Sequence, residues 1–398
     1  MPLRSLTRPL WLTVRILLVL AGCWYVASRI TWVDMLIVRA DAHSIVDSRL
    51  AGGGSFRCER IGEGQARVVL ASGEVVTVSL PTGANSGLEL RPGLRSTFAE
   101  SDWRWLGIAL LVSIPVFFIQ ASRWGRLLTV RSIELPFYQN LRMSLIGSFC
   151  NYFMLGSTGG DVVKACYVVQ AAPQGKAAAV STVVADRIVG LISLVGICAV
   201  GLASPVIQAS PRIAWAVAAS IVATAVGCLI VMAWSRMRHL QSLRSSPMLA
   251  PIRALLDHAV PFVHSPRVLG ICLIQSVVSY LLFIFVYACC AQAVGFAGHW
   301  GVLAATIPVI AFAGSLPISY LGFGVMEPVA MTLLADPGFA DPNQVVMFLL
   351  LGRLVLFIWS LSGAVFIATG QDAYAAETSA VPVDGEPAAT TPARSVNP

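Results

Sequence analysis

Charged residues are scarce in this chain of 398 residues. Asp, Glu, Lys and Arg make up 12% of it, whereas hydrophobic residues make up 57%. Soluble domains usually contain roughly 25% charged residues, because their surfaces face water. The composition therefore excludes an ordinary soluble domain and predicts a polytopic membrane protein.

Short motifs of hydrolytic, metal-binding and redox sites are also missing. The nine cysteines form no CxxC pair, and all of them except Cys58 lie in or beside apolar segments. The five histidines are scattered, and neither HExxH nor GxSxG occurs. We therefore expect no disulfide framework, no metal site, no cofactor and no enzymatic activity.

Long apolar runs are abundant instead. Six windows are long enough to span a bilayer, at residues 10–30, 103–122, 179–203, 213–234, 268–294 and 344–369. Two more apolar blocks, at 143–171 and 300–335, are interrupted by glycines. A glycine-broken apolar block suits a re-entrant hairpin that lines a cavity. The expected fold is all-α, with about six spans and two re-entrant helical hairpins.

Basic residues are distributed unevenly between the two sides of these spans. The short loops of one side contain twelve of them, and the other side has Arg212 alone. The twelve are Arg4, Arg8, Arg123, Arg126, Arg131, Arg142, Lys176, Arg236, Arg238, Arg244, Arg253 and Arg267. The positive-inside rule then predicts that both termini lie in the cytoplasm. The expected location is the inner membrane of a bacterium. The net charge of +7 reflects this bias and suits anionic inner-leaflet lipid, so it requires no nucleic-acid partner.

Residues 1–30 are expected to form the first transmembrane anchor. The run Leu20-Ala21-Gly22-Cys23 is also typical of a lipoprotein cleavage site, which would leave a lipidated Cys23. Apolar sequence continues to Val26, giving the length of a full span. This favours an uncleaved anchor over a processed signal peptide.

Two further segments flank the predicted transmembrane domain at 103–369. Residues 31–102 are expected to form a small extracytoplasmic α+β module that binds a partner protein or acts as a spacer. It would contain an amphipathic helix at 32–50 and a β-hairpin over 66–80 that turns at Ser72-Gly73. Residues 370–398, rich in Ala, Pro, Thr and Ser, are expected to form a disordered cytoplasmic tail.

The first glycine-broken block contains Asp161 and Lys164. Ionisable groups at membrane depth cost roughly 2.5–3.5 kcal/mol each, so they mark a polar pathway by default. Gly159-Gly160-Asp161 would begin a helix whose free N–H groups attract an anion such as a lipid phosphate, with Lys164 one turn further on. In the competing interpretation, Asp161 caps the helix and Lys164 pairs with it or snorkels. Arg123, Trp124 and Arg126 are interpreted as interfacial anchors.

A shift of 166 positions aligns the polar residues of the two halves. Gly156 falls on Gly322, Asp161 on Glu327 and Arg187 on Arg353. The unit of span, hairpin and span then occurs twice with opposite orientation, which is the architecture of many secondary transporters. Glu327 and Arg353 either pair with each other or contact substrate separately, and Asp186 and Arg187 pose the same choice in the first half.

These residues also give the chain a resemblance to a known family. It resembles the lysylphosphatidylglycerol synthase transmembrane-region family, which comprises flippase-like integral membrane proteins, over approximately residues 103–369. The likeness rests on Asn151 with Gly159-Gly160-Asp161-Val-Val-Lys164, on Asp186-Arg187-Ile-Val-Gly190-Leu, on Pro317-Ile-Ser319 with Gly322-Phe-Gly324-Val and Glu327, and on Arg353.

The chain departs from that family at three positions. The family usually has Pro at the position of Leu155, and Arg at the positions of Lys164 and Met326. Without two guanidinium groups, bidentate phosphate recognition is lost at those points, so the lipid substrate is expected to differ or to bind more weakly. No soluble aminoacyl-transferase domain is expected after residue 369, and hence no lysyl-phosphatidylglycerol synthesis.

The sequence therefore predicts a protein that moves a phospholipid or a lipid-linked headgroup between membrane leaflets. Its expected path residues are Asn151, Gly159, Gly160, Asp161, Lys164, Asp186, Arg187, Pro317, Ser319, Gly322, Gly324, Glu327 and Arg353. Two alternatives stay open. One is an intramembrane enzyme acting on a lipid-linked sugar, and the other is a membrane scaffold whose outer module binds a partner.

Overall fold

The computed structural model describes residues 17, 20–38, 54–60, 65–70, 74–79, 88–153, 159–171, 175–236, 250–296, 299–316 and 321–369. Within them, five helices are long and apolar enough to cross a membrane. They are α3 (Trp103–Thr129), α6 (Lys176–Gly201), α8 (Pro211–Arg236), α10 (Pro266–Ala293) and α13 (Pro342–Ala368). The all-α polytopic class is confirmed.

The first expected span is described only in part. Residues 20–29 are helical and pass through Cys23 without a break. Tyr25, Val26 and Ile30 pack against the main apolar core of the helical domain, while Leu20 and Trp24 are exposed. One face of this helix is therefore held by the protein, and the opposite face is free to meet lipid.

Both glycine-broken blocks form pairs of shorter helices. The first contains α4 (Phe137–Phe153) and α5 (Gly159–Ala171), which pack on each other. The second contains α11 (Trp300–Ser315), α12 (Met326–Ala330) and the π-helical turn η4 (Met331–Ala335). The backbone before α12 is left-handed at Leu321, Gly322 and Gly324, with φ of 51°, 78° and 75°. Two glycines meet this requirement without strain, since they lack a β-carbon.

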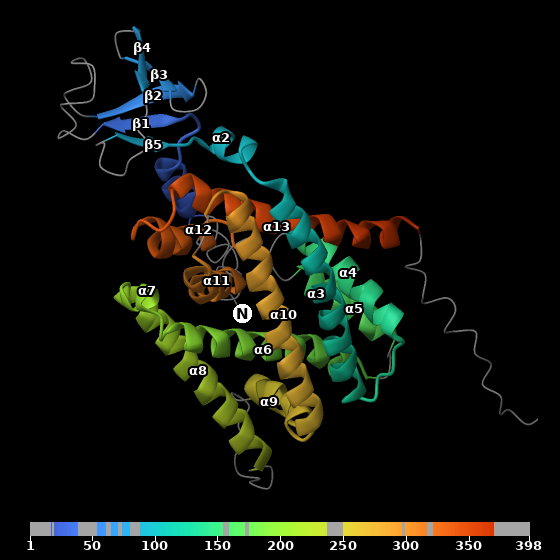
Figure 1. Ribbon diagram of the computed structural model, residues 1–398. Helices are drawn as coiled ribbons and strands as arrows, with labels where there is room; N and C mark the ends of the chain where they lie inside the picture. Colours follow the sequence, from blue (N-terminus) through green and yellow to red (C-terminus); the bar gives the residue numbers. More distant parts are fainter. Residues whose placement is uncertain are drawn as a thin grey trace, which may run out of the picture.

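The helices of the two halves interlock (Figure 1). The long helices α3 and α10 pack side by side, α4 packs on α13, and α11 packs on α6. The first helix of each broken block therefore lies against the last span of the other half. The largest buried core is formed mainly by α10, α11, α12 and α13.

Two helices connect or cover the spans on the sides of the bundle. The short helix α7 (Pro205–Gln208) joins α6 to α8. The helix α9 (Ala250–Val263), which was not expected from the sequence, packs on α8 and α10. Arg131, just after α3, donates to the backbone oxygen of His258 at 2.9 Å and lies over the Phe262 ring. The loop between α8 and α10 is thus partly structured.

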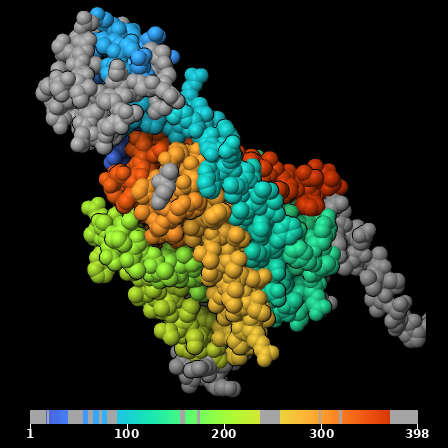
Figure 2. Space-filling view, in the orientation of Figure 1, coloured from blue at the N-terminus to red at the C-terminus, as the bar shows by residue number. Residues whose placement is uncertain are grey.

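An antiparallel five-stranded sheet stands at one end of the helical domain (Figures 1 and 2). Its order is β4-β3-β2-β1-β5, and the strands are β1 (Met35–Val38), β2 (Gly54–Arg60), β3 (Gln65–Val69), β4 (Val75–Ser79) and β5 (Leu88–Arg91). The helix α2 (Leu94–Ala99) connects the sheet to α3. We call strands β1–β5 the β-module.

The β-module corrects one prediction and confirms another. The amphipathic helix expected at 32–50 is wrong at residues 35–38, which form β1 and pair with β2 and β5; residues 39–50 lie outside the described residues. Alternate residues Leu36 and Val38 are buried, as the pleat of a strand requires. The hairpin of β3 and β4 is confirmed, with Val69 opposite Val75, and its expected turn at 72–73 lies outside the described residues.

Candidate functional site

The first half of the helical domain contains a bidentate ion pair between α5 and α6. Arg187 donates from Nε to Asp161 Oδ2 at 2.6 Å and from Nη2 to Oδ1 at 2.9 Å. Asp161 lies in the first turn of α5, where the helix dipole favours a negative charge. The Arg187 side chain is 56% exposed and that of Asp161 is 19% exposed. This pair is therefore open to its surroundings.

The second half contains a buried ion pair between α12 and α13. Arg353 donates from Nη1 to Glu327 Oε1 at 2.5 Å, and the backbone N–H of Gly324 donates to Glu327 Oε2 at 2.8 Å. The Phe323 ring lies 3.9 Å from the guanidinium carbon of Arg353, close enough for a cation–π contact. The side chains of Arg353 and Glu327 are only 9% and 7% exposed. This pair is sealed.

The two pairs have the same construction. In each, an acid in the first turn of the second hairpin helix pairs with an arginine 26 residues later, on the following span. The repeat register derived from the sequence predicted this correspondence. Glu327 and Arg353 do pair, whereas Arg187 pairs with Asp161 and not with its neighbour Asp186.

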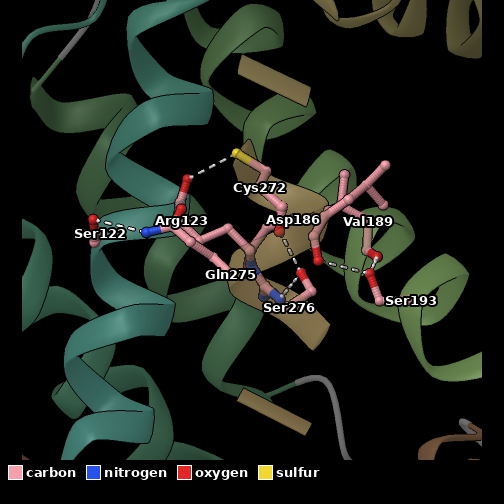
Figure 3. A network of polar contacts seen from close by, with 9 residues as sticks. Ser122, Arg123, Asp186, Val189, Ser193, Cys272, Gln275 and Ser276 are labelled. Carbon is pink, nitrogen blue, oxygen red and sulfur yellow. Dashed lines mark hydrogen bonds and ion pairs between the residues drawn. The ribbon is translucent and has the colours of Figure 1, made fainter. Parts of the chain in front are cut away.

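Asp186 belongs to a third, buried network between α3, α6 and α10 (Figure 3). Arg123 Nε donates to Asp186 Oδ1 at 2.8 Å, and Arg123 Nη1 donates to Ser276 Oγ at 2.8 Å. Around it, the side-chain amide of Gln275 donates to Ser122 Oγ at 3.1 Å. Arg123 and Asp186 are 8% and 9% exposed. Three helices are thus joined by one polar cluster inside the bundle.

This network overturns part of the expectation for residues 123–126. Arg123 is not an interfacial anchor, because it pairs inside the bundle, and Trp124 is fully buried; only Arg126 is exposed. Arg142 is also buried within α4. The one signal for the Arg123 site was Asp186 itself, since a carboxylate inside an apolar span needs a cationic partner.

Lys164 contacts an aromatic ring on α3. Its Nζ lies 5.1 Å from the centre of the Trp124 ring, within the range of a cation–π contact. Among the described residues Asp161 is engaged by Arg187, so the expected alternative of an Asp161–Lys164 pair is wrong. Lys164 is therefore an additional cation beside two carboxylates that already have arginine partners.

Close backbone packing explains the glycines of α5. A β-carbon on Gly160 would overlap the carbonyl group of Gly147 on α4. The N–H of Gly160 donates to the Asn151 side-chain oxygen at 2.8 Å, so Asn151 ties the two hairpin helices together. Gly159 is buried as well. These residues shape the hairpin that presents Asp161 and Lys164.

The predicted site residues therefore fall into two groups. Asn151, Gly159, Gly160, Asp161, Lys164, Asp186 and Arg187 gather on the first hairpin and α6, and Gly322, Gly324, Glu327 and Arg353 gather on the second hairpin and α13. Tyr152 links the halves, since its hydroxyl donates to the Arg353 carbonyl at 3.4 Å. Pro317 and Ser319 lie outside the described residues.

The two groups also differ in charge. When Arg123, the partner of Asp186, is counted with it, the first group has three cations, Arg123, Lys164 and Arg187, against Asp161 and Asp186, whereas the second has one cation and one anion. In the part of the chain that the structure describes, no three His, Cys, Asp or Glu side chains gather as a metal site requires. The arrangement suits the binding of an anionic group near Lys164 and Arg187.

Comparisons with known proteins identify the family of the chain. Residues 92–363 match the family described as lysylphosphatidylglycerol synthase TM region. A stretch of 98 residues is 33% identical to a UPF0104 membrane protein of Pyrococcus horikoshii, covering 24% of this chain and 29% of that relative. The chain thus aligns with less than a third of this relative's length. Because the family match extends over more than half of the sequence, the chain belongs to the lysylphosphatidylglycerol synthase transmembrane-region family.

Proposed function

We propose that this protein moves a phospholipid or a lipid-linked headgroup between the leaflets of a bacterial inner membrane. The observation that carries the proposal is the pair of matching ion pairs, Asp161–Arg187 and Glu327–Arg353, one in each half of the helical domain. Charged groups at membrane depth are costly and are retained where they line a polar pathway. Two such sites, one open and one sealed, suit a headgroup that passes between them.

An inverted repeat relates the two halves in this proposal. The reciprocal packing of α4 on α13 and of α11 on α6 supports it, because a two-fold axis between the halves would generate both contacts from one. The equal spacing of the two ion pairs supports it independently. Broken helices at the interface of inverted repeats are typical of transporters that bind substrate near the membrane midplane.

The headgroup is expected to contain a phosphate. Lys164 and Arg187 would contact it, because the first-half group has one more cation than it has carboxylates. Arg187 is half exposed, and its Nη1 is not used in the two bonds to Asp161. A guanidinium group also matches the geometry of a phosphate better than an ammonium group does. In this proposal the protein carries out no covalent chemistry, and both termini lie in the cytoplasm as the basic loops predict.

Leaflet exchange in proteoliposomes tests the function. Fluorescent phosphatidylglycerol, phosphatidylethanolamine and a phosphate-free glycosyl diacylglycerol would be compared by quenching the outer leaflet with dithionite. We expect exchange of one or both phospholipids above the rate in protein-free liposomes, and loss of that exchange with Arg353→Gln. Exchange of the phosphate-free lipid alone would contradict the assignment of a phosphate. If the protein exchanges none of these three lipids, and does not exchange an added lipid-linked sugar either, the proposed function is wrong.

Cysteine labelling tests the orientation. The native Cys58 is unsuitable, since it is 8% exposed in the sheet core, whereas Ser55 on β2 is exposed. With the exposed Cys23 and Cys166 replaced by Ala, a Ser55→Cys variant should react with an impermeant maleimide in intact cells. Reaction only after permeabilisation would reverse the orientation.

A further inference from the structure

The family match begins at residue 92, yet the preceding part of the chain contacts the sealed ion-pair site. Residues 20–29 form a helix whose face of Gly22, Tyr25 and Val26, continued by Ile30 directly after it, turns toward the protein. These positions recur with the three- and four-residue spacing of one helical face. We call residues 20–29 the N-terminal helix.

Gly22 places the backbone of the N-terminal helix directly on the second hairpin. A β-carbon added to Gly22 would overlap the carbonyl oxygen, the α-carbon and the carbonyl carbon of Gly324. All three obstructing atoms belong to the backbone, so no side-chain rotation can relieve the overlap. Any larger residue at position 22 must displace either the helix or the hairpin.

Gly324 is also the residue that fixes Glu327. Its N–H donates to Glu327 Oε2 at 2.8 Å, while Glu327 Oε1 accepts from Arg353. The backbone there is left-handed, with φ of 75° at Gly324 and 78° at Gly322, which allows the N–H to turn toward the carboxylate. The contacts therefore run from Gly22 through one peptide to the buried ion pair.

Two more contacts fix the N-terminal helix along the same half. Arg29 pairs with Asp336 at 3.4 Å, just after η4. The Thr31 N–H donates to Asn343 Oδ1 at 3.1 Å, and Asn343 Nδ2 donates to Thr31 Oγ1 at 2.9 Å, at the start of α13. Contacts from Gly22 to Gly324 and from Arg29 to Asp336 follow the same chain direction, so the helix runs alongside the returning arm of the hairpin.

The β-module is attached to the same point. Asn343 Nδ2 also donates to the carbonyl of Pro92 at 2.7 Å, and Asp34 accepts from the N–H of Gly93 at 2.6 Å. In the described part of the chain, the polar side-chain contacts of residues 20–34 with the helical domain go to Asp336 and Asn343, both in the second half. The first hairpin has no such brace among these contacts.

We propose that Gly22 is a positioning residue of the second ion-pair site. It lets the N-terminal helix seat against Gly324 and hold that peptide where its N–H meets Glu327, so that the Glu327–Arg353 pair stays sealed. The role in leaflet exchange rests on the proposed function, whereas the structural effect on Gly324 and Glu327 does not.

Substitutions at position 22 and at its exposed neighbours test the proposal. Gly22→Ala and Gly22→Leu would be compared with Ala21→Leu and Cys23→Leu, since residues 21 and 23 are exposed on the same helix. Hydrogen exchange measured by mass spectrometry would follow peptides that contain residues 321–330 and, as a reference, residues 137–153. Losing a hydrogen bond to a charged group should speed local hydrogen exchange about tenfold or more.

We expect faster hydrogen exchange at 321–330 in both Gly22 variants, larger for Leu than for Ala, with the reference peptides and the two control variants unchanged. Unchanged exchange at 321–330 in folded Gly22→Leu protein overturns the proposal. So does an equal increase in the reference peptides, because that indicates general destabilisation. If Gly22→Leu does not fold, the same comparison with Gly22→Ala decides.

Leaflet exchange supplies the second readout. Gly22→Leu should lower lipid exchange, and its loss of unfolding free energy should not add to that of Glu327→Gln, since both changes act on the same ion pair. Full additivity of the two losses in the double variant would show that Gly22 acts elsewhere. If the wild-type protein exchanges no lipid, the proposed function fails, and the hydrogen-exchange comparison still decides the role of Gly22.

Discussion

The two ion pairs are alike in construction and opposite in exposure. Both join the first turn of a hairpin helix to a span 26 residues later, but Arg187 is 56% exposed and Arg353 is 9% exposed. The equal spacing therefore matches the residues that pair, and their surroundings set which pair is accessible. In the proposed transporter, such a difference between the two halves would suit alternating access.

Three neighbours close the sealed pair in the second half. Phe323 stacks on Arg353, Met326 Sδ accepts from Arg353 Nη2 at 3.4 Å, and the N-terminal helix meets the hairpin at Gly324. Around the open pair, Lys164 adds a cation. The second half thus keeps a neutral, closed site, and the first half keeps a positively charged, accessible one.

The largest effect is expected from breaking the sealed pair. Glu327→Gln leaves Arg353 buried without its anion, and Arg353→Gln leaves Glu327 without its cation. Removing one member of a buried pair costs about 3–5 kcal/mol, so each variant should lose that much unfolding free energy, and leaflet exchange should be abolished. Chemical unfolding in detergent and the proteoliposome assay would measure the two effects.

The double variant Glu327→Gln/Arg353→Gln provides the control. Independent sites add within roughly 0.3–0.5 kcal/mol, whereas residues in contact do not. The double variant should lose clearly less stability than the sum of the single variants. Full exchange activity in both single variants at normal expression would remove the pair from the path.

A comparable loss of stability is expected in the Arg123–Asp186 network. The positions 166 residues after Arg123 and Asp186 are Cys289 and Gly352, so the repeat offers no counterpart. Arg123→Gln should cost about 3–5 kcal/mol, because Asp186 would stay buried and charged. Asp186→Asn in the same chain should restore part of the loss, and a double variant less stable than Arg123→Gln would contradict their coupling.

The contact between Arg123 and Asp186 could not be predicted from the sequence. The Asp161–Arg187 and Glu327–Arg353 pairs could be matched because the same spacing between an acid and an arginine occurs twice in the chain. Arg123 and Asp186 occur once, 63 residues apart on helices whose packing brings them together. Strand β1 was missed for a similar reason, since its partners β2 and β5 are separate segments and long-range pairing overrides a local helical pattern.

A smaller difference in stability is expected between alanine variants of two glycines, one on the last span of each half. A β-carbon on Gly352 would lie 2.6 Å from the Tyr287 ring, whereas one on Gly190 would lie 3.5 Å from the nearest atom, Arg123 Nη1. Gly352→Ala should therefore cost about 1–3 kcal/mol through overpacking. Gly190→Ala should be tolerated, and equal losses in thermal unfolding would show that the second half is not the more tightly packed.

Lys164 should affect binding more than stability. Lys164→Gln removes the additional cation of the open site, and we expect exchange of anionic lipid to fall about tenfold, which corresponds to 1.4 kcal/mol. Lys164→Arg should retain or raise the rate, because a guanidinium keeps the charge and can bind phosphate in a bidentate manner. Equal rates for Lys164→Gln and wild type with phosphatidylglycerol would exclude Lys164 from headgroup binding.

The smallest change in stability is expected at the open pair, and it gives the sharpest comparison with the sealed one. Exposed ion pairs contribute about 0–1 kcal/mol where water screens both charges, as it would in an open polar pathway. Asp161→Asn and Arg187→Gln should therefore unfold almost like wild type.

If the open pair lines the path, both variants should nevertheless lose leaflet exchange, so that activity falls without a matching loss of stability. If the pair only ties α5 to α6, exchange should fall no further than the small stability loss predicts. Measuring unfolding and exchange on the same preparations separates these outcomes, and wild-type exchange in both variants would assign the open pair a structural role.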